Sequence, residues 1–298
     1  RIELVGAAAR RPVGDAAGLV DGEPDQRPVA ARHQRRHHVE GDVDRDLAGG
    51  GAGASSDAQR TFVVPGSIPQ GLIETIIVNR AAFIDDLESV LARDAEVASV
   101  AGDPAGPMYG GLLLLIDKKH AIAAEWMPPA LVAVAGGRSY VAGREGLSLR
   151  KPAEVALERM ARAARADGIT LVVSSTYRSY DYQKKVYERN VREMGEQAAR
   201  RESAKPGESQ HQLGTAVDFG SITDEYAATR AGKWLASHAG EYGWSLSFPK
   251  GMEAVTGYRW ECWHYRYIGV EAVALQDTWF GGSQQYMLEF IDAWRRWK

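Results

Sequence analysis

The sequence predicts an α+β fold in which a small, mainly antiparallel sheet is flanked by helices. Short β-rich runs alternate with segments whose apolar residues recur every three or four positions, as on one face of a helix. Two of the runs are joined through Pro249-Lys250-Gly251, a turn-forming sequence that predicts an antiparallel pair. We expect strands at residues 112–116, 169–173, 215–219, 244–248 and 258–261.

The composition is that of a packed globular protein without a pronounced charge. The chain has 298 residues, 45% of them hydrophobic, and its formal net charge of −3 gives no electrostatic case for nucleic-acid binding. A single cysteine excludes an intrachain disulfide, and no apolar run approaches the ~18 residues that indicate a membrane span. The first residue is Arg rather than Met, so the lack of a visible signal peptide says nothing about export.

Changes in composition divide the chain into four parts. Residues 1–60 lack aromatic side chains and are rich in Ala, Gly, Arg and Asp, so burial cannot offset their ordering entropy, and we expect a disordered tail or linker. Residues 61–108 are expected to be a partly helical extension or spacer. Residues 109–275 form the main domain, and residues 276–298 carry a helix that packs on it.

Two predicted helices surround the expected strands. Pro152 suits the first turn of a helix that ends near Gly168. Ser179 or Asp181 is suited to cap the next helix, whose inward stripe begins with Gln183. A glutamine on an inward face needs a hydrogen-bond partner, so Gln183 either caps nearby backbone or contacts a ligand.

Three later segments complete the helical and loop predictions. Residues 195–208 are polar and are expected to form a loop over the site, and residues 229–239 form a short helix. Ser283 is a good N-cap for a terminal helix, for which core packing is favoured over a membrane-surface role. The apolar stripe of that helix is Tyr286, Met287, Phe290, Ile291 and Trp294.

The chemistry is concentrated in residues 209–218, which read Ser-Gln-His-Gln-Leu-Gly-Thr-Ala-Val-Asp. Gly214 allows a tight reversal, because glycine adopts positive φ without steric cost. The strand that follows alternates, so Asp218 shares its face only with Ala216 and Gly214, which leaves room near the carboxylate. His211 and Asp218 carry side chains that bind zinc, and a third ligand would leave one position open for hydrolysis.

A second motif, Glu261-Cys262-Trp263-His264, supplies the third ligand and a base. His264 is the best third ligand, and Glu261 is the candidate base. In a regular strand these two residues would point to opposite faces. They can face one metal only if the chain bulges or turns between them.

Together the motifs Ser-x-His-x-x-Gly-x-Ala-x-Asp and Glu-x-Trp-His resemble those of the VanY-type zinc D-alanyl-D-alanine carboxypeptidases, of the hedgehog/DD-peptidase superfamily. The resemblance extends over residues 112–269, about half of the chain. The family usually has proline where this sequence has Cys262, so the local turn is expected to be less rigid. The resemblance implies a hedgehog/DD-peptidase-like fold and one Zn²⁺ ion held by His211, Asp218 and His264.

The resemblance also implies the roles of the remaining candidates. Glu261 takes a proton from water and passes it to the leaving amine. Arg178 stabilises the developing oxyanion or clamps the terminal carboxylate of the substrate. Gln183 and Ser209 are expected to hold the same carboxylate, and Tyr177, next to Arg178, is a further substrate-binding candidate.

The resemblance implies removal of the C-terminal D-alanine from peptidoglycan stem peptides. Cleavage of an L,D bond and endopeptidase action use the same metal site and stay open, as does a catalytically silent zinc module that binds cell-wall peptide. A purely structural zinc site would need a fourth ligand, for which Cys262 is the only cysteine. We expect a monomer whose partner is the stem peptide and, from that substrate, an extracytoplasmic location in a bacterium.

Overall fold

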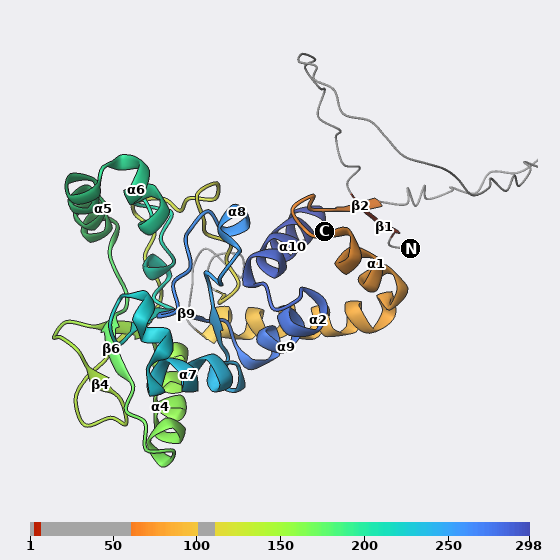
Figure 1. Cartoon of the computed structure of the whole chain (residues 1–298). Helices are drawn as coiled ribbons and strands as arrows, with labels where there is room; N and C mark the ends of the chain where they lie inside the picture. The colour runs from red at the N-terminus through yellow and green to blue at the C-terminus, as the bar shows by residue number, and fades with distance from the viewer. Residues whose placement is uncertain (1–2, 7–60, 101–110) are drawn as a thin grey trace, which may run out of the picture.

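The computed structural model describes residues 3–6, 61–100 and 111–298 (Figure 1). Its main sheet has five strands in the order β4 (Val141–Ala142), β6 (Val172–Ser175), β7 (Ala216–Phe219), β9 (His264–Tyr267) and β8 (Trp244–Leu246). The pair β4–β6 is parallel and the other three pairs are antiparallel. The predicted α+β class with a mainly antiparallel sheet is therefore confirmed.

Register in the central strands brings the two sequence motifs together. Asp218 on β7 lies opposite His264 on β9 and opposite Ser175 on β6. The β6–β7 pairing shifts register between Val173 and Ser175, as at a β-bulge. The sheet thus places three polar residues from distant parts of the chain side by side.

One hydrophobic core lies under this sheet, against α4 (Lys151–Ala166) and α7 (Arg230–His238). Pro152 lies in the first turn of α4, and Gly168 follows the helix with φ 70°, as the sequence predicts. Two short 3₁₀-helices, η2 (Asp224–Ala228) and η3 (Ala239–Tyr242), flank α7. A separate two-stranded sheet pairs β3 (Leu131–Ala133) with β5 (Ser148–Arg150).

The predicted helix after Ser179 is α5 (Tyr180–Met194), and the Ser179 side chain accepts a hydrogen bond from the Tyr182 N–H. The expected loop at residues 195–208 is only partly a loop, because α6 (Glu196–Glu202) occupies its first half. Ala199, within α6, is fully buried, and this packing stabilises a helix that the polar composition did not indicate.

A second core joins the segments before and after the main sheet. It contains α1 (Gln70–Val78), α2 (Arg80–Val100), α9 (Val270–Trp279) and α10 (Gln284–Trp297), with β2 (Thr61–Val64) beside them (Figure 1). Ser283 caps α10 by accepting from the Tyr286 N–H, and the whole predicted apolar stripe of this helix is buried. The apolar side of α10 is therefore buried within this second core.

Two predicted strands are wrong. Residues 112–116 are buried except for the half-buried Leu114, but they pair with no described strand, because side chains take their backbone groups instead. Asp94 accepts from the Leu112 and Leu113 N–H groups, while Arg266 donates to the Leu112 and Leu114 carbonyls. Residues 258–261 form a loop, and the strand of this hairpin is β9, which starts at His264.

The first sixty residues fall mostly outside the described residues. Residues 3–6 form β1 (Glu3–Gly6), which pairs in parallel with β2, so this short part differs from the tail that we expected. An exposed strand edge has N–H and C=O groups that need hydrogen-bond partners, and the backbone of β1 provides these partners for β2. The predicted tail at residues 7–60 lies outside the described residues.

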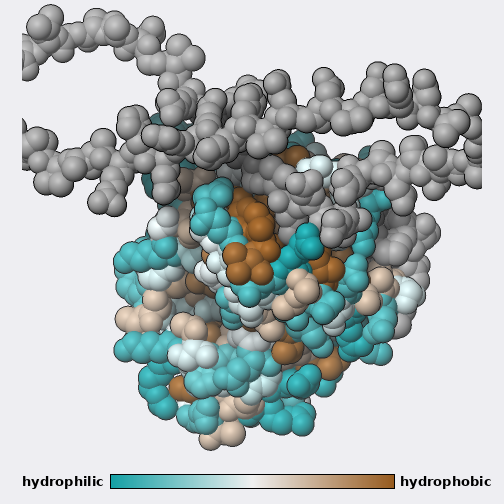
Figure 2. Space-filling model, turned by 90° about the vertical axis from the view of Figure 1, so that its right-hand side faces the viewer, coloured by the Kyte–Doolittle hydropathy of each residue, from teal (hydrophilic) through white to brown (hydrophobic). Residues whose placement is uncertain are grey.

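The face on the side of α1 and α2 carries apolar residues beside hydrophilic ones (Figure 2). The exposed large apolar side chains of β2 and α1 are Val63, Ile77 and Val78. Among the described helices, none combines the length and the hydropathy needed to cross a bilayer.

Candidate metal and catalytic site

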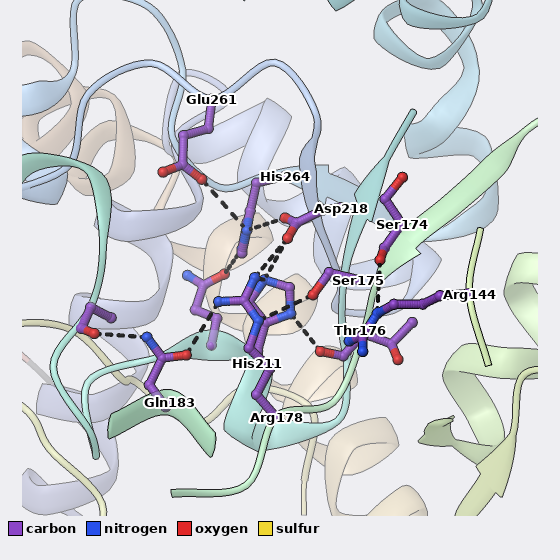
Figure 3. Close-up of polar contacts among 12 residues, drawn as sticks. Arg144, Ser174, Ser175, Thr176, Arg178, Gln183, His211, Asp218, Glu261 and His264 are labelled. Carbon is purple, nitrogen blue, oxygen red and sulfur yellow. Dashed lines mark hydrogen bonds and ion pairs between the residues drawn. The ribbon is translucent and has the colours of Figure 1, made fainter. Parts of the chain in front are cut away.

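Three side chains of types that can bind metal converge beside the central strands (Figure 3). His211 lies in the 3₁₀-helix η1 (Gln210–Leu213), which ends at Gly214 with φ 68°, and Asp218 and His264 lie opposite each other on β7 and β9. The candidate ligand atoms all lie within 4.8 Å of one another, and all three residues are buried. The structure therefore brings together the three residues that the sequence singled out as metal ligands.

The hydrogen-bond partners of His211 determine which ring nitrogen is free. Its Nδ1 lies 2.7 Å from the Thr176 carbonyl, which can only accept, so Nδ1 carries the proton. Its Nε2 therefore presents a lone pair to Asp218 Oδ2, 3.1 Å away. This is the tautomer that a metal ligand needs.

His264 is oriented in the same way through the opposite nitrogen. Its Nε2 lies 3.2 Å from Gln210 Oε1 and its Nδ1 lies 3.0 Å from Asp218 Oδ1, so the tautomer with its proton on Nε2 leaves Nδ1 free for a metal. Two histidines and an aspartate suit zinc, so the residues present fit a single Zn²⁺ ion.

Electrostatics keep the donors in the states that bind metal. Burial, and then the Arg178 guanidinium, lower the pKa of His211 to about 4, so its imidazole is neutral at pH 7. Burial raises the pKa of Asp218, but its interactions with His211 and His264 outweigh burial and hold that pKa well below the usual range. The cluster therefore offers a neutral His211 imidazole and an ionised Asp218 carboxylate.

Glu261 reaches the cluster through a turn rather than a strand. Its N–H donates to the Phe248 carbonyl, and its own carbonyl accepts from the His264 N–H, both at 3.1 Å. This turn places Glu261 Oε2 3.7 Å from His264 Nδ1 and resolves the expected conflict of strand faces. Burial and the Asp218 carboxylate raise the pKa of Glu261 well above its usual range.

Arg178 lies at the entrance to α5 and points into the same cluster (Figure 3). One terminal nitrogen lies 2.8 Å from Asp218 Oδ2 and 3.0 Å from His211 Nε2, and the other donates to Gln183 Oε1 at 3.2 Å. Gln183 is fully buried, and its Nε2 donates to the Ala204 carbonyl at 2.7 Å. In this structure Gln183 thus holds Arg178 against the loop after α6.

A cavity of about 390 Å³ opens over the cluster. Its lining includes Arg178, Ser209, Glu261 and the three candidate ligands, with residues of α5 forming another wall. Tyr177 and Gln183 are not part of the lining, and the Tyr177 hydroxyl lies 3.5 Å from Met127 Sδ. Of the predicted substrate-binding residues, Ser209 alone borders the cavity.

Cys262 points away from the cluster. Its Sγ lies 3.6 Å from the Thr223 carbonyl and 3.8 Å from the Asp224 carbonyl. The one group of candidate ligands found among the described residues contains three members and does not include this cysteine. The geometry gives no support to a closed, four-ligand structural site that uses Cys262.

Sequence reasoning missed two partners of the ligands. The Thr176 carbonyl is a backbone group, and no side-chain pattern identifies it. Gln210 stands between two residues of the first motif, and its polar side chain in a buried 3₁₀-helix was the available signal.

Comparison with known proteins decides the family. The family model for VanY, D-alanyl-D-alanine carboxypeptidase, matches residues 146–270, which contain every candidate residue named above. The solved structure of the LdcB LD-carboxypeptidase aligns with a TM-score of 0.54 and 31% identity, over 61% of this chain and 87% of that one. The chain belongs to the VanY family. A VanY D,D-pentapeptidase mutant solved with Zn(II) aligns with a TM-score of 0.50 and 28% identity, over 59% of this chain and 98% of that one.

Curated VanY relatives are longer than the matched region. YodJ of Bacillus subtilis (strain 168) is 36% identical over 174 residues, which are 56% of this chain and 64% of YodJ. A D-alanyl-D-alanine carboxypeptidase of Enterococcus faecium is 28% identical over 185 residues, covering 60% of this chain and 58% of that protein. The chain thus spans about three-fifths of the length of these relatives.

Proposed function

We propose that this protein is a zinc-dependent carboxypeptidase that removes the C-terminal D-alanine from peptidoglycan stem peptides ending in D-Ala-D-Ala. One observation carries the proposal. Two histidines and an aspartate whose candidate ligand atoms lie within 4.8 Å of one another share one cavity with a buried carboxyl and an arginine. A zinc site that only held the fold would have no use for a positioned base or for an opening to solvent.

His211 Nε2, Asp218 and His264 Nδ1 are the proposed ligands. A zinc ion held there supplies Lewis-acid chemistry, polarising the scissile carbonyl and making water more acidic. The Thr176 carbonyl and Gln210 act behind the two histidines, because each fixes the tautomer that leaves the correct nitrogen free.

Glu261 is the proposed general base and acid. Its carboxylate accepts a proton from the attacking water and then gives that proton to the amine of the departing D-alanine, so the residue ends in its starting state. Its raised pKa suits both halves of this task, because a carboxyl of ordinary pKa would hold the proton too weakly. Its position beside His264 puts it next to the atoms that react.

Arg178 and Ser209 are the proposed partners of the negative charges on the substrate. The guanidinium is planar and can donate two parallel hydrogen bonds to the terminal carboxylate or stabilise the developing oxyanion. Gln183 is a positioning residue in this scheme, because its buried amide holds the arginine in place. Ser209 borders the cavity and can donate its hydroxyl proton.

A second candidate is cleavage of an L,D bond, favoured by the alignment with the LdcB LD-carboxypeptidase. Both reactions release D-alanine at the same metal site and differ only in the residue before the scissile bond. In either case the substrate is a cell-wall peptide, which supports an extracytoplasmic location. We also propose that the chain acts as a monomer, since every candidate catalytic group comes from one chain.

Matched peptides test the proposal. The full chain, loaded with zinc, is incubated with a pentapeptide stem ending in D-Ala-D-Ala and with the corresponding tetrapeptide, and the products are weighed by mass spectrometry. The proposal predicts loss of one alanine from the pentapeptide; loss from the tetrapeptide alone favours the L,D reaction. Binding of both peptides with no release of D-alanine would contradict an enzyme and favour a silent binding module.

A further inference from the structure

We propose that Gln210 and Gln284 form a hydrogen-bonded relay that fixes the tautomer of His264 and makes the C-terminal helix α10 part of the metal site. The inference rests on the proposed zinc site and deepens it. It concerns positioning, because neither glutamine is a proposed ligand.

The relay starts at a group whose hydrogen-bond role cannot change. The Ser245 carbonyl on β8 can only accept, and Gln284 Nε2 lies 3.4 Å from it. Gln284 must therefore turn its Oε1 the other way, where it accepts from Gln210 Nε2 at 3.2 Å. Ser247 Oγ lies 2.7 Å from Gln210 Oε1 and 3.3 Å from Gln284 Oε1, so its hydroxyl can donate to either amide oxygen in this orientation.

The orientation of the Gln210 amide in turn affects the proposed ligand His264. With its Nε2 turned to Gln284, Gln210 presents Oε1 to His264, 3.2 Å from the ring Nε2. An amide oxygen can only accept, so this contact stabilises the tautomer with the His264 proton on Nε2, in which the Nδ1 lone pair beside Asp218 is free for a metal. The backbone of β8 thereby selects the binding tautomer of a residue on β9.

Because these residues are buried, the choice of His264 tautomer depends on the relay and not on bulk water. Gln210, Gln284, Ser247 and His264 are each at most 6% exposed, so bulk water does not replace a lost partner. Without the Gln210 oxygen, the proton would move to Nδ1, where the Asp218 carboxylate accepts it. A proton at that place competes directly with a metal ion.

The relay also gives a function to sequence outside the matched family region. Gln284 is the first residue of α10 and lies beyond residues 146–270. The Ser283 cap and the buried stripe of the helix, packed in the core shared with α2, hold Gln284 in place. The flanking helices therefore complete the coordination environment and are not merely attached to it.

Zinc affinity of the full chain, measured by chelator competition, tests the relay. Loss of an outer-shell partner typically costs 10–100-fold in metal affinity, so Gln210→Leu should weaken zinc binding by that factor. Gln284→Leu should weaken it less, by under about tenfold, and should add nothing in the Gln210→Leu background. Gln210→Glu, which keeps an acceptor for His264, should restore most of the affinity.

Gln276→Leu is the matched control. Gln276 is also a buried glutamine and accepts from Ser245 Oγ at 2.7 Å, but its side chain forms no hydrogen bond with Gln210 or His264. Its loss should leave zinc affinity unchanged even if stability falls. An equal loss of affinity in this control and in Gln284→Leu would overturn the relay, because it would show a general effect of packing.

Nitrogen-15 NMR of the metal-free protein gives a readout independent of zinc. The His264 ring should carry its proton on Nε2 in the native protein and on Nδ1 in Gln210→Leu. Unchanged zinc affinity and an unchanged tautomer in Gln210→Leu would overturn the relay while leaving the proposed function intact. A native chain that binds no zinc would instead overturn the metal site itself, and the relay with it.

Discussion

Replacing Glu261 by glutamine separates the chemical step from metal binding. Glutamine has nearly the same size and can still hydrogen-bond water, but it cannot accept a proton. Proton transfer by a positioned group contributes about 10²–10⁴-fold to a rate. At 1.36 kcal/mol for each factor of ten, the barrier should rise by roughly 3–5 kcal/mol.

The structure predicts that the same substitution leaves the rest of the site intact. Glu261 lies 3.7 Å from His264 Nδ1 and is not among the three candidate ligands, so zinc content should not fall. Its carboxyl is buried near the Asp218 carboxylate, and a neutral amide removes their mutual repulsion. The free energy of unfolding of the metal-free protein should therefore stay the same or increase.

The assay follows D-alanine released from a pentapeptide stem, with zinc content measured on the same samples. Glu253→Gln is the control, because this carboxylate pairs with Arg201 at the surface and does not border the cavity. It should keep both zinc and rate. A zinc-loaded Glu261→Gln protein that releases D-alanine within tenfold of the native rate would refute the assigned role.

Three further variants test other parts of the account. His211→Ala removes a proposed ligand and should weaken zinc binding by more than about 100-fold, since loss of even an outer partner costs 10–100-fold; unchanged zinc content would contradict this. Arg178→Ala should lower kcat/KM by about 10²–10³-fold yet bind zinc at least as tightly, because it removes a cation 3.0 Å from His211 Nε2; weaker zinc binding would argue for a structural role. Phe83→Ala opens the core against Trp279 and Phe290 and should cost about 3–5 kcal/mol of unfolding free energy in urea, with zinc affinity unchanged in the folded protein; a smaller cost would mean that α2 is loosely packed.

The sequence predicted those elements whose pattern is local. The terminal helix, its Ser283 cap and its apolar stripe all follow from a period near 3.6 residues, and the structure confirms them. Residues 112–116 have the composition of a buried strand, but Asp94 and Arg266 from distant parts of the chain take their backbone hydrogen bonds. No local pattern reveals such partners, so this strand could not be excluded from sequence.

In the candidate site too, residues in short motifs could be predicted from the sequence, whereas roles that depend on distant contacts could not. The motif spacing selected His211, Asp218 and His264, and the register of β7 with β9 brings the last two together. The opposed strand faces of Glu261 and His264 required a turn, and the structure has one. The amide of Gln210, by contrast, acquires its role only when α10 packs beside it, because its direction is set by a partner 74 residues away.

Removal and return of zinc tests whether the release of D-alanine depends on a metal ion at the proposed site. The native chain is stripped with a chelator, its metal content is checked, and D-alanine release from the pentapeptide stem is measured before and after adding one equivalent of zinc. We expect the stripped protein to release no D-alanine above background. Its activity should return when one zinc ion is bound per chain. Undiminished release from a chain shown to hold no metal would contradict it.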